Sequence, residues 1–180
     1  DALTKDNDNI HLDVFSSFAI YGWVEADQHF EPLYEKIRNH PQMTYHGFAT
    51  NDVLREHLKQ SHILAYPSIW PETSCRVLIE SMSAGLFCVH PNIAALPETS
   101  GGITFMYQFS QDMQQHADTF YKYLDKAVEN YKDDQMKNYL RFVKTYADTR
   151  FNVNALSKQW LSLLKEMKEK YPTVESRKFP

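Results

Sequence analysis

The chain has 180 residues, of which 43% are hydrophobic and 14% aromatic, and its formal net charge is −4. A chain of this length and composition can bury the core of one domain. Its mild negative charge excludes the strongly basic surface of a nucleic-acid-binding protein, and no apolar run reaches the roughly 18 residues of a membrane span.

Residues 1–9 are polar and aperiodic, so we interpret them as a remnant or linker rather than a signal peptide. The stretch from Asp6 to Asp8 resembles the DxD metal motif of some sugar transferases. It precedes a predicted strand instead of following one, so we interpret it as a solvated turn and expect no metal site. Cys75 and Cys88 lack metal-ligand spacing, which favours reduced thiols and a cytoplasmic location.

Apolar runs alternate with helical patterns along the chain. Five of these runs predict strands, at residues 10–15, 43–46, 63–66, 86–89 and 103–106. Periodic segments predict helices over residues 27–40, 50–60, 72–84, 111–131, 133–147 and 152–171. Pro91 and Pro97 predict an irregular stretch between the last two strands. The order βαβαβαβ followed by helices predicts a Rossmann-like parallel α/β sheet with helices on both faces.

The segment from His62 to His90 combines a strand, a loop, a helix and a second strand. We expect its helix to begin near Glu72 and to end at Gly85. A helix N-terminus at the carboxyl edge of a parallel sheet offers unpaired amides to an anion, often a phosphate. The amides expected to face that anion belong to Thr73, Ser74, Cys75 and Arg76. Neither a dinucleotide fingerprint nor a P-loop is present.

Glu80 lies on this helix among apolar neighbours, so we expect it to be largely buried. A buried carboxylate needs a partner, and vicinal ribose hydroxyls could supply one. Arg76 opposes the helix dipole unless a diphosphate binds there. An ion pair between Arg76 and Glu80, four residues apart, is an equally supported interpretation.

Glu72 and Glu80, with seven residues between them, resemble the E-x7-E part of the PS-x-x-E-x7-E pattern of a known family. This is the donor-binding half of GT-B glycosyltransferases of the group 1, or family 4, type. The Pro67-Ser68 pair precedes the two glutamates, with three residues rather than two before Glu72. Residues 94–98 are similar to the family's GG-L-P-E segment. The resemblance extends over about residues 10–167.

The resemblance implies a retaining hexosyltransferase that uses a UDP-, GDP- or ADP-sugar without an obligatory metal or other cofactor. It assigns Glu72 to the donor sugar as the catalytic residue and Glu80 to the ribose hydroxyls. The loop after His46 would face the base. The donor-binding positions expected from the resemblance and from the sheet edge are Ser16, Ser17, His46, Gly47, Ser68, Thr73, Ser74, Cys75, Arg76, Val77 and Glu80.

The chain also departs from the family. Cys75 stands where the family usually has glycine, which would narrow the approach to the phosphate. The family's phosphate-binding arginine and lysine lie upstream of the first strand seen here. We therefore expect the C-terminal domain of a two-domain enzyme, with a remnant at 1–9, a donor-binding domain at 10–150 and a closing helix and tail at 151–180.

In that arrangement the acceptor, and any peripheral membrane contact, would be reached through the missing N-terminal domain. Part of the apolar stripe of the closing helix would then be exposed. Two alternatives remain open. One is a fragment of a GT-B-like nucleotide-sugar 2-epimerase, and the other is a non-catalytic module that binds a nucleotide sugar or a partner protein.

Overall fold

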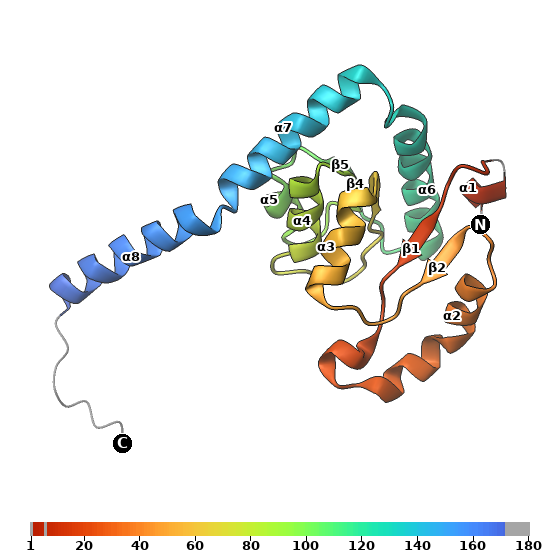
Figure 1. Ribbon diagram of the computed structural model, residues 1–180, viewed down its shortest axis with the longest axis horizontal. Coiled ribbons are helices and arrows are strands. Elements are labelled where there is room, and N and C mark those ends of the chain that lie inside the picture. The colour runs from red at the N-terminus through yellow and green to blue at the C-terminus, as the bar shows by residue number, and fades with distance from the viewer. Residues whose placement is uncertain (1, 6, 172–180) are drawn as a thin grey trace.

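The computed structural model describes residues 2–5 and 7–171 and shows an α/β domain from which one helix projects (Figure 1). In chain order, the elements are α1 (Ala2–Lys5), β1 (Leu12–Val14), η1 (Phe18–Tyr21), η2 (Val24–Phe30), α2 (Glu31–Arg38), β2 (Met43–Tyr45), α3 (Asn51–Gln60), β3 (Ile63–Ala65), α4 (Arg76–Ala84), β4 (Phe87–Pro91), α5 (Leu96–Ser100), β5 (Phe105–Tyr107), α6 (Met113–Asn130), α7 (Asp134–Arg150) and α8 (Val153–Lys170). The candidate motif Asp6–Asp8 includes Asp6, which lies outside the described residues, as does the tail 172–180.

All strand pairs are parallel, as predicted. The strands form two hydrogen-bonded groups, β1–β2 and β3–β4–β5, rather than one continuous ladder. Within the described chain β1 pairs only with β2, and β3 pairs only with β4. One edge of β1 and one edge of β3 are therefore left without a strand partner in this part of the chain.

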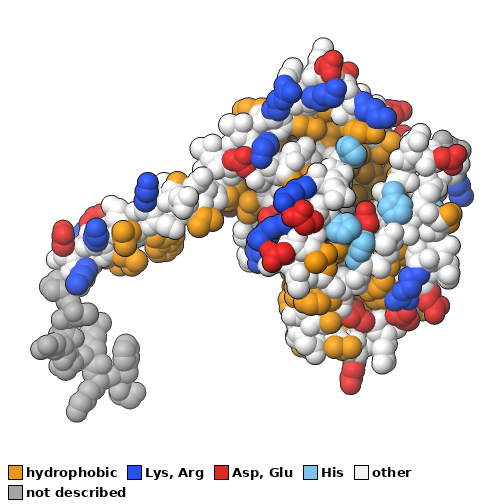
Figure 2. All heavy atoms as spheres, in the orientation of Figure 1, with side chains coloured by type: hydrophobic (Ala, Val, Ile, Leu, Met, Phe, Trp, Pro, Cys, Tyr) orange, Lys and Arg blue, Asp and Glu red, His pale blue; other side chains and the backbone are white. Residues whose placement is uncertain are grey.

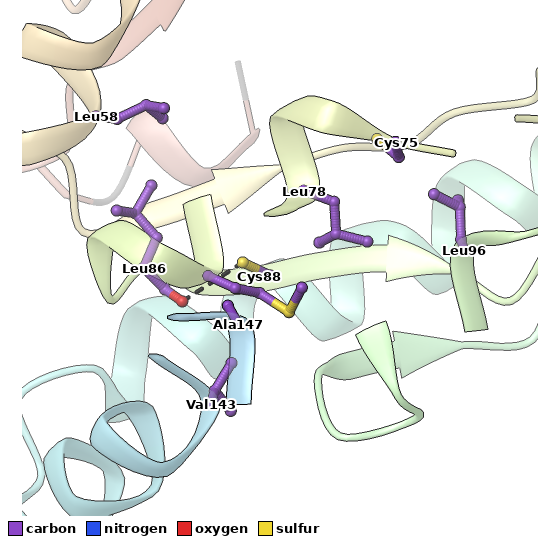
Figure 3. Packing of buried hydrophobic residues seen from close by; sticks show 9 residues of the cluster. Leu58, Cys75, Leu78, Leu86, Cys88, Leu96, Val143 and Ala147 are labelled. Atoms are coloured by element: carbon purple, nitrogen blue, oxygen red, sulfur yellow. Dashed lines mark hydrogen bonds between the residues drawn. The ribbon is translucent and has the colours of Figure 1, made fainter. Parts of the chain in front are cut away.

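Strand β4 is buried at every residue because helices cover both of its faces. Phe87 and Val89 pack with Tyr107 and with Ala127 of α6. Cys88 faces the opposite way, into the core that α4 and α7 share with it (Figure 3). That core consists of Leu58, Cys75, Leu78, Met82, Leu86, Cys88, Leu96, Val143 and Ala147. The alternation of side chains along a strand produces this two-sided burial, and the prediction of helices on both faces is confirmed.

Several predicted boundaries are wrong. The helix predicted over 27–40 is a 3-10 segment, η2, followed by the shorter α2. The stretch predicted to be irregular contains α5, because Pro97 lies in its first turn, where a missing N–H is tolerated. Residues 1–9, for which no element was predicted, contain the single turn of α1. Helix α4 begins at Arg76, four residues after the predicted start at Glu72.

Helix α8 projects from the domain, and apolar side chains run along it (Figures 1 and 2). Trp160, Leu164 and Met167 are each about half exposed or more. The expected exposure of part of this stripe is therefore confirmed. Among the described helices, none combines the length and the apolar character needed to cross a membrane.

Candidate functional site

The N-terminus of α4 lies directly beyond the loop that leaves β3. Cys75 occupies the N-cap position with an extended backbone, at φ −96° and ψ 98°, and its side chain makes no capping hydrogen bond. The first turn of α4 contains no acidic residue. At the other end, Gly85 has φ 85° and donates its N–H to the carbonyls of Ser81 and Met82, as the sequence predicted. The positive end of the α4 dipole is thus not offset by an acidic side chain of its own first turn.

The late start of α4 changes which backbone amides belong to this helix end. Thr73 and Ser74 are exposed and lie in a bend before the helix rather than in its first turn. The first helical amides are those of Arg76, Val77 and Leu78. A phosphate at the helix mouth would therefore lie one turn further along the chain than the sequence suggested.

Cys75 is only 2% exposed, and its side chain lies in the core beside Leu78 and Leu96 (Figure 3). Burial raises the pKa of the Cys75 thiol, while the amides of Leu78 and Val77 oppose that rise. Since the thiol group faces inward, it does not cover the outer surface of the loop. The narrowing expected from a cysteine in the usual glycine position is therefore not imposed by its side chain.

Glu72 lies in the loop before α4 and is held from two sides. Its Oε1 accepts a hydrogen bond from Tyr66 Oη at 2.8 Å. Burial, and secondarily this carboxylate, raise the pKa of Tyr66 far above its usual value. The backbone carbonyl of Glu72 accepts from the amide of Ala95 at 3.1 Å. The two separate motif stretches, at residues 67–72 and 94–98, are therefore joined through Glu72.

Glu80 projects from α4, and its side chain is 22% exposed. Its Oε1 lies 3.2 Å from Nη2 of Arg55 and 3.7 Å from Nη2 of Arg76. The ion pair between Arg76 and Glu80, one of two interpretations left open by the sequence, is present. Arg55 was missed because it lies 25 residues earlier, on α3, and only the packing of α3 against α4 reveals it. The expected need of Glu80 for a partner is met within the chain.

The side chain of Ser68 forms a hydrogen bond within its own loop. Its Oγ accepts from the amide of Trp70 at 3.2 Å. Trp70 itself is 70% exposed. The loop after β3 therefore presents a large aromatic surface beside Glu72.

Ser16 and Ser17 follow β1, as predicted, but their side chains form hydrogen bonds with residues of the segment from η1 to α2. Ser17 Oγ donates to Asp27 Oδ2 at 2.6 Å and accepts from the amide of Ala19, in the first turn of η1. Ser16 Oγ lies 3.5 Å from Tyr34 Oη. The hydrogen bond from Ser17, followed by that from the Phe18 amide, holds the pKa of Asp27 below its ordinary value.

His46 and Gly47 follow β2, and Gly47 has φ 63°, a conformation that favours glycine. His46 Nε2 lies 2.6 Å from Asp13 Oδ1, and the His46 ring stacks on Phe15 with 4.4 Å between centroids. His57 of α3 completes this group. No sequence pattern indicated that Asp13, His46 and His57 meet, because they come from separate parts of the chain.

Two hollows of the surface lie away from Glu72 and Glu80. One hollow, of about 210 Å³, lies between the α1 region and α6. The other, of about 360 Å³, is lined by residues 22–26. No residue that the sequence assigned to donor binding lines either of them. The candidate site is therefore defined by the N-terminus of α4 and by Glu72 and Glu80, and not by either hollow.

The arrangement of parallel strands and covering helices matches that of solved glycosyltransferases. A glycosyltransferase from Rickettsia africae ESF-5 superposes with a TM-score of 0.72 at 16% sequence identity, over 92% of this chain and 42% of that protein. The catalytic domain of starch synthase IV from Arabidopsis thaliana, bound to ADP and acarbose, superposes with a TM-score of 0.57 at 16% identity, over 92% of this chain and 41% of that one.

The model of the family "Glycosyl transferases group 1" matches residues 6–126, and the chain therefore belongs to that family. No curated protein matches the sequence. The chain spans less than half the length of each of the two solved structures named above.

Proposed function

We propose that this chain is the donor-binding part of a retaining glycosyltransferase and that it binds a nucleotide-diphosphate sugar at the N-terminus of α4. One observation carries the proposal. Glu72 lies just before the helix and Glu80 lies in its second turn, so the two carboxylates flank an uncompensated helix end beyond β3. Membership of the group 1 family and the ADP bound to the starch synthase catalytic domain agree with such a ligand.

Each part of this site suits a different part of the ligand. The amides of Arg76, Val77 and Leu78 suit the diphosphate, because a helix N-terminus carries roughly half a positive charge. The Glu80 carboxylate can accept hydrogen bonds from both ribose hydroxyls. Glu72, fixed by Tyr66 and Ala95, would then contact the sugar on the far side of the phosphates.

Arg55 and Arg76 modify this picture, because both contact the same carboxylate oxygen of Glu80. Both guanidinium groups are half exposed or more, and such surface ion pairs contribute only about 0–1 kcal/mol each. Ribose hydroxyls can therefore share Glu80 or displace one arginine at small cost. Arg76, freed from Glu80, would lie in the first turn beside the diphosphate.

Transfer of the sugar would require more than this chain. In the proposed enzyme, a second domain holds the acceptor and the upstream cations, while the α4 amides stabilise the departing diphosphate electrostatically. The donor base remains one of uracil, guanine or adenine. A UDP-, GDP- or ADP-sugar is the ligand class that the site fits, with no metal required for its binding.

The test is a calorimetric titration of the 180-residue chain and its variants with UDP-, GDP- and ADP-glucose and with the corresponding nucleoside diphosphates. Loss of hydrogen bonds to a charged group costs about 1.5–3 kcal/mol, so Glu80→Ala should weaken nucleoside diphosphate binding roughly 10- to 150-fold. Glu72→Ala should leave nucleoside diphosphate binding intact and weaken only nucleotide-sugar binding.

The matched control is Glu129→Ala, which removes an exposed glutamate of α6 and should change neither affinity. Unchanged diphosphate affinity in Glu80→Ala would contradict the ribose assignment. An equal loss of affinity for the nucleoside diphosphate and for the nucleotide sugar in Glu72→Ala would contradict the sugar assignment.

A further inference from the structure

A second group of polar side chains lies apart from Glu72 and Glu80. Asp13 of β1, His46 just after β2 and His57 of α3 each direct one possible ligand atom into a common space, and these three atoms lie within 4.8 Å of one another. His46 Nε2 is 2.6 Å from Asp13 Oδ1, and His57 Nδ1 is 4.0 Å from the same oxygen. Figure 2 shows histidine side chains gathered near the middle of the face that it presents.

The β1–β2 ladder explains why these residues meet. Asp13 pairs with Thr44 in the parallel register, so alternation places Asp13 and His46 on the same face of the two strands. The amide of His46 donates to the carbonyl of Val14 at 2.9 Å, which extends the ladder to His46. Helix α3 brings His57 over this face. The backbone of three elements therefore fixes the three side chains relative to one another.

An aromatic ring supports both imidazoles from one side. Phe15 stacks on His46 with an interplanar angle of 6° and meets His57 edge-on, with 5.0 Å between centroids. The two imidazole rings are themselves 4.6 Å apart, between centroids. Held in this way, the nitrogens lose little conformational freedom when they bind a ligand, so less binding energy is spent on ordering them.

Two imidazole nitrogens and one carboxylate oxygen form a ligand set that suits divalent transition metals rather than the oxygen-seeking Mg²⁺ and Ca²⁺. Tetrahedral Zn²⁺ with ligands at about 2.0–2.2 Å requires ligand atoms roughly 3.4 Å from each other. The observed 2.6 Å and 4.0 Å lie on either side of this value. Side-chain shifts of the order of 1 Å would therefore bring all three atoms into the coordination geometry.

We propose that Asp13, His46 and His57 form a three-ligand Zn²⁺ site. The three side chains are between 23% and 34% exposed, so water can reach the fourth coordination position. Three protein ligands with an open position are typical of zinc sites that bind a further molecule. The proposal departs from the sequence-based expectation that the chain contains no metal site.

The zinc site shares no residue with Glu72, Glu80 or the α4 amides proposed to hold the donor, although it includes His46, which the family resemblance placed near the base. Helix α3 carries Arg55, which contacts Glu80, and His57, which faces Asp13. Residues two apart on an α-helix point about 200° from each other, so the two contacts lie on different sides of α3. A zinc ion at Asp13 would thus lie on a different side of α3 from the contact between Arg55 and Glu80. Either proposal can fail while the other stands.

The test measures Zn²⁺ binding to the 180-residue chain by equilibrium dialysis with metal analysis, and Co²⁺ binding by visible absorption, which reports tetrahedral coordination. The wild type should bind one Zn²⁺ per chain and give the intense tetrahedral Co²⁺ spectrum. Its melting temperature should rise by roughly 5–10 °C at a hundredfold excess of free Zn²⁺ over the Kd.

His57→Ala and the nearly isosteric Asp13→Asn should each weaken Zn²⁺ binding at least tenfold and abolish the tetrahedral spectrum. The control His62→Ala removes an exposed histidine outside the group and should behave as the wild type. Circular dichroism establishes that each variant is folded before the comparison. The proposal is overturned if the wild type binds no more Zn²⁺ than His57→Ala, or if His62→Ala loses as much binding as Asp13→Asn.

Discussion

Ala94 holds a left-handed backbone conformation, with φ 50°, immediately before the residue whose amide donates to the Glu72 carbonyl. It stands in the segment that resembles GG-L-P-E, at a position where the family pattern has glycine. Left-handed geometry costs an L-residue about 1–2 kcal/mol, whereas glycine adopts it freely. Glycine also loses more conformational freedom on folding than alanine, which lowers the free energy of unfolding by about 0.5–1 kcal/mol. We therefore expect Ala94→Gly to raise the free energy of unfolding by about 0.5–1 kcal/mol.

The neighbouring residue provides the control. Ala95 has φ −83°, which any residue adopts. Ala95→Gly therefore relieves no strain and should lower the free energy of unfolding by about 0.5–1 kcal/mol. Urea denaturation followed by circular dichroism measures both free energies. In a thermal melt of a chain this size, the two variants should shift the melting temperature by about 1–4 °C in opposite directions. A destabilised Ala94→Gly, similar to Ala95→Gly, would refute the reasoning from backbone strain.

Two further predictions concern residues near the proposed site and at the turn after β1. Cys75→Ala should lower the free energy of unfolding by about 1–2 kcal/mol in urea melts, because the thiol is buried in the core. The same variant should leave the affinity for a nucleoside diphosphate unchanged. A gain in affinity would show that the thiol obstructs the site. The pKa of Asp27 is lower in the folded chain than in the unfolded chain, so its contribution to stability is present above about pH 4 and is lost as the pH falls further. Asp27→Asn should therefore show a shallower loss of stability than the wild type in acid urea melts, and identical slopes would contradict the role given to Ser17.

The five strands and the long helices α6 to α8 were predictable because apolar periodicity identifies them without knowledge of their neighbours. The start of α4 was not, because Glu72, Thr73 and Ser74 are residue types that commonly open helices. Their loop is instead held by the Tyr66 hydroxyl and the Ala95 amide. These tertiary contacts outweigh the local capping preference.

Parts of the candidate site were visible in the sequence for a similar reason. The Arg76–Glu80 pair lies within one helix, so its spacing alone indicates it as one of two interpretations. Arg55 and the group of Asp13, His46 and His57 depend on how α3 packs over other elements. No spacing along the chain encodes such contacts, and only the three-dimensional arrangement reveals them.

Donor binding at the N-terminus of α4 is tested most directly by an NMR titration of the ¹⁵N-labelled 180-residue chain with a nucleoside diphosphate, up to millimolar concentration. We expect saturable shifts concentrated on the amides of Arg76, Val77 and Leu78 and on the loop containing Glu72. Shifts confined to other surfaces, or no shifts at millimolar ligand, would contradict the claim that the N-terminus of α4 binds the donor.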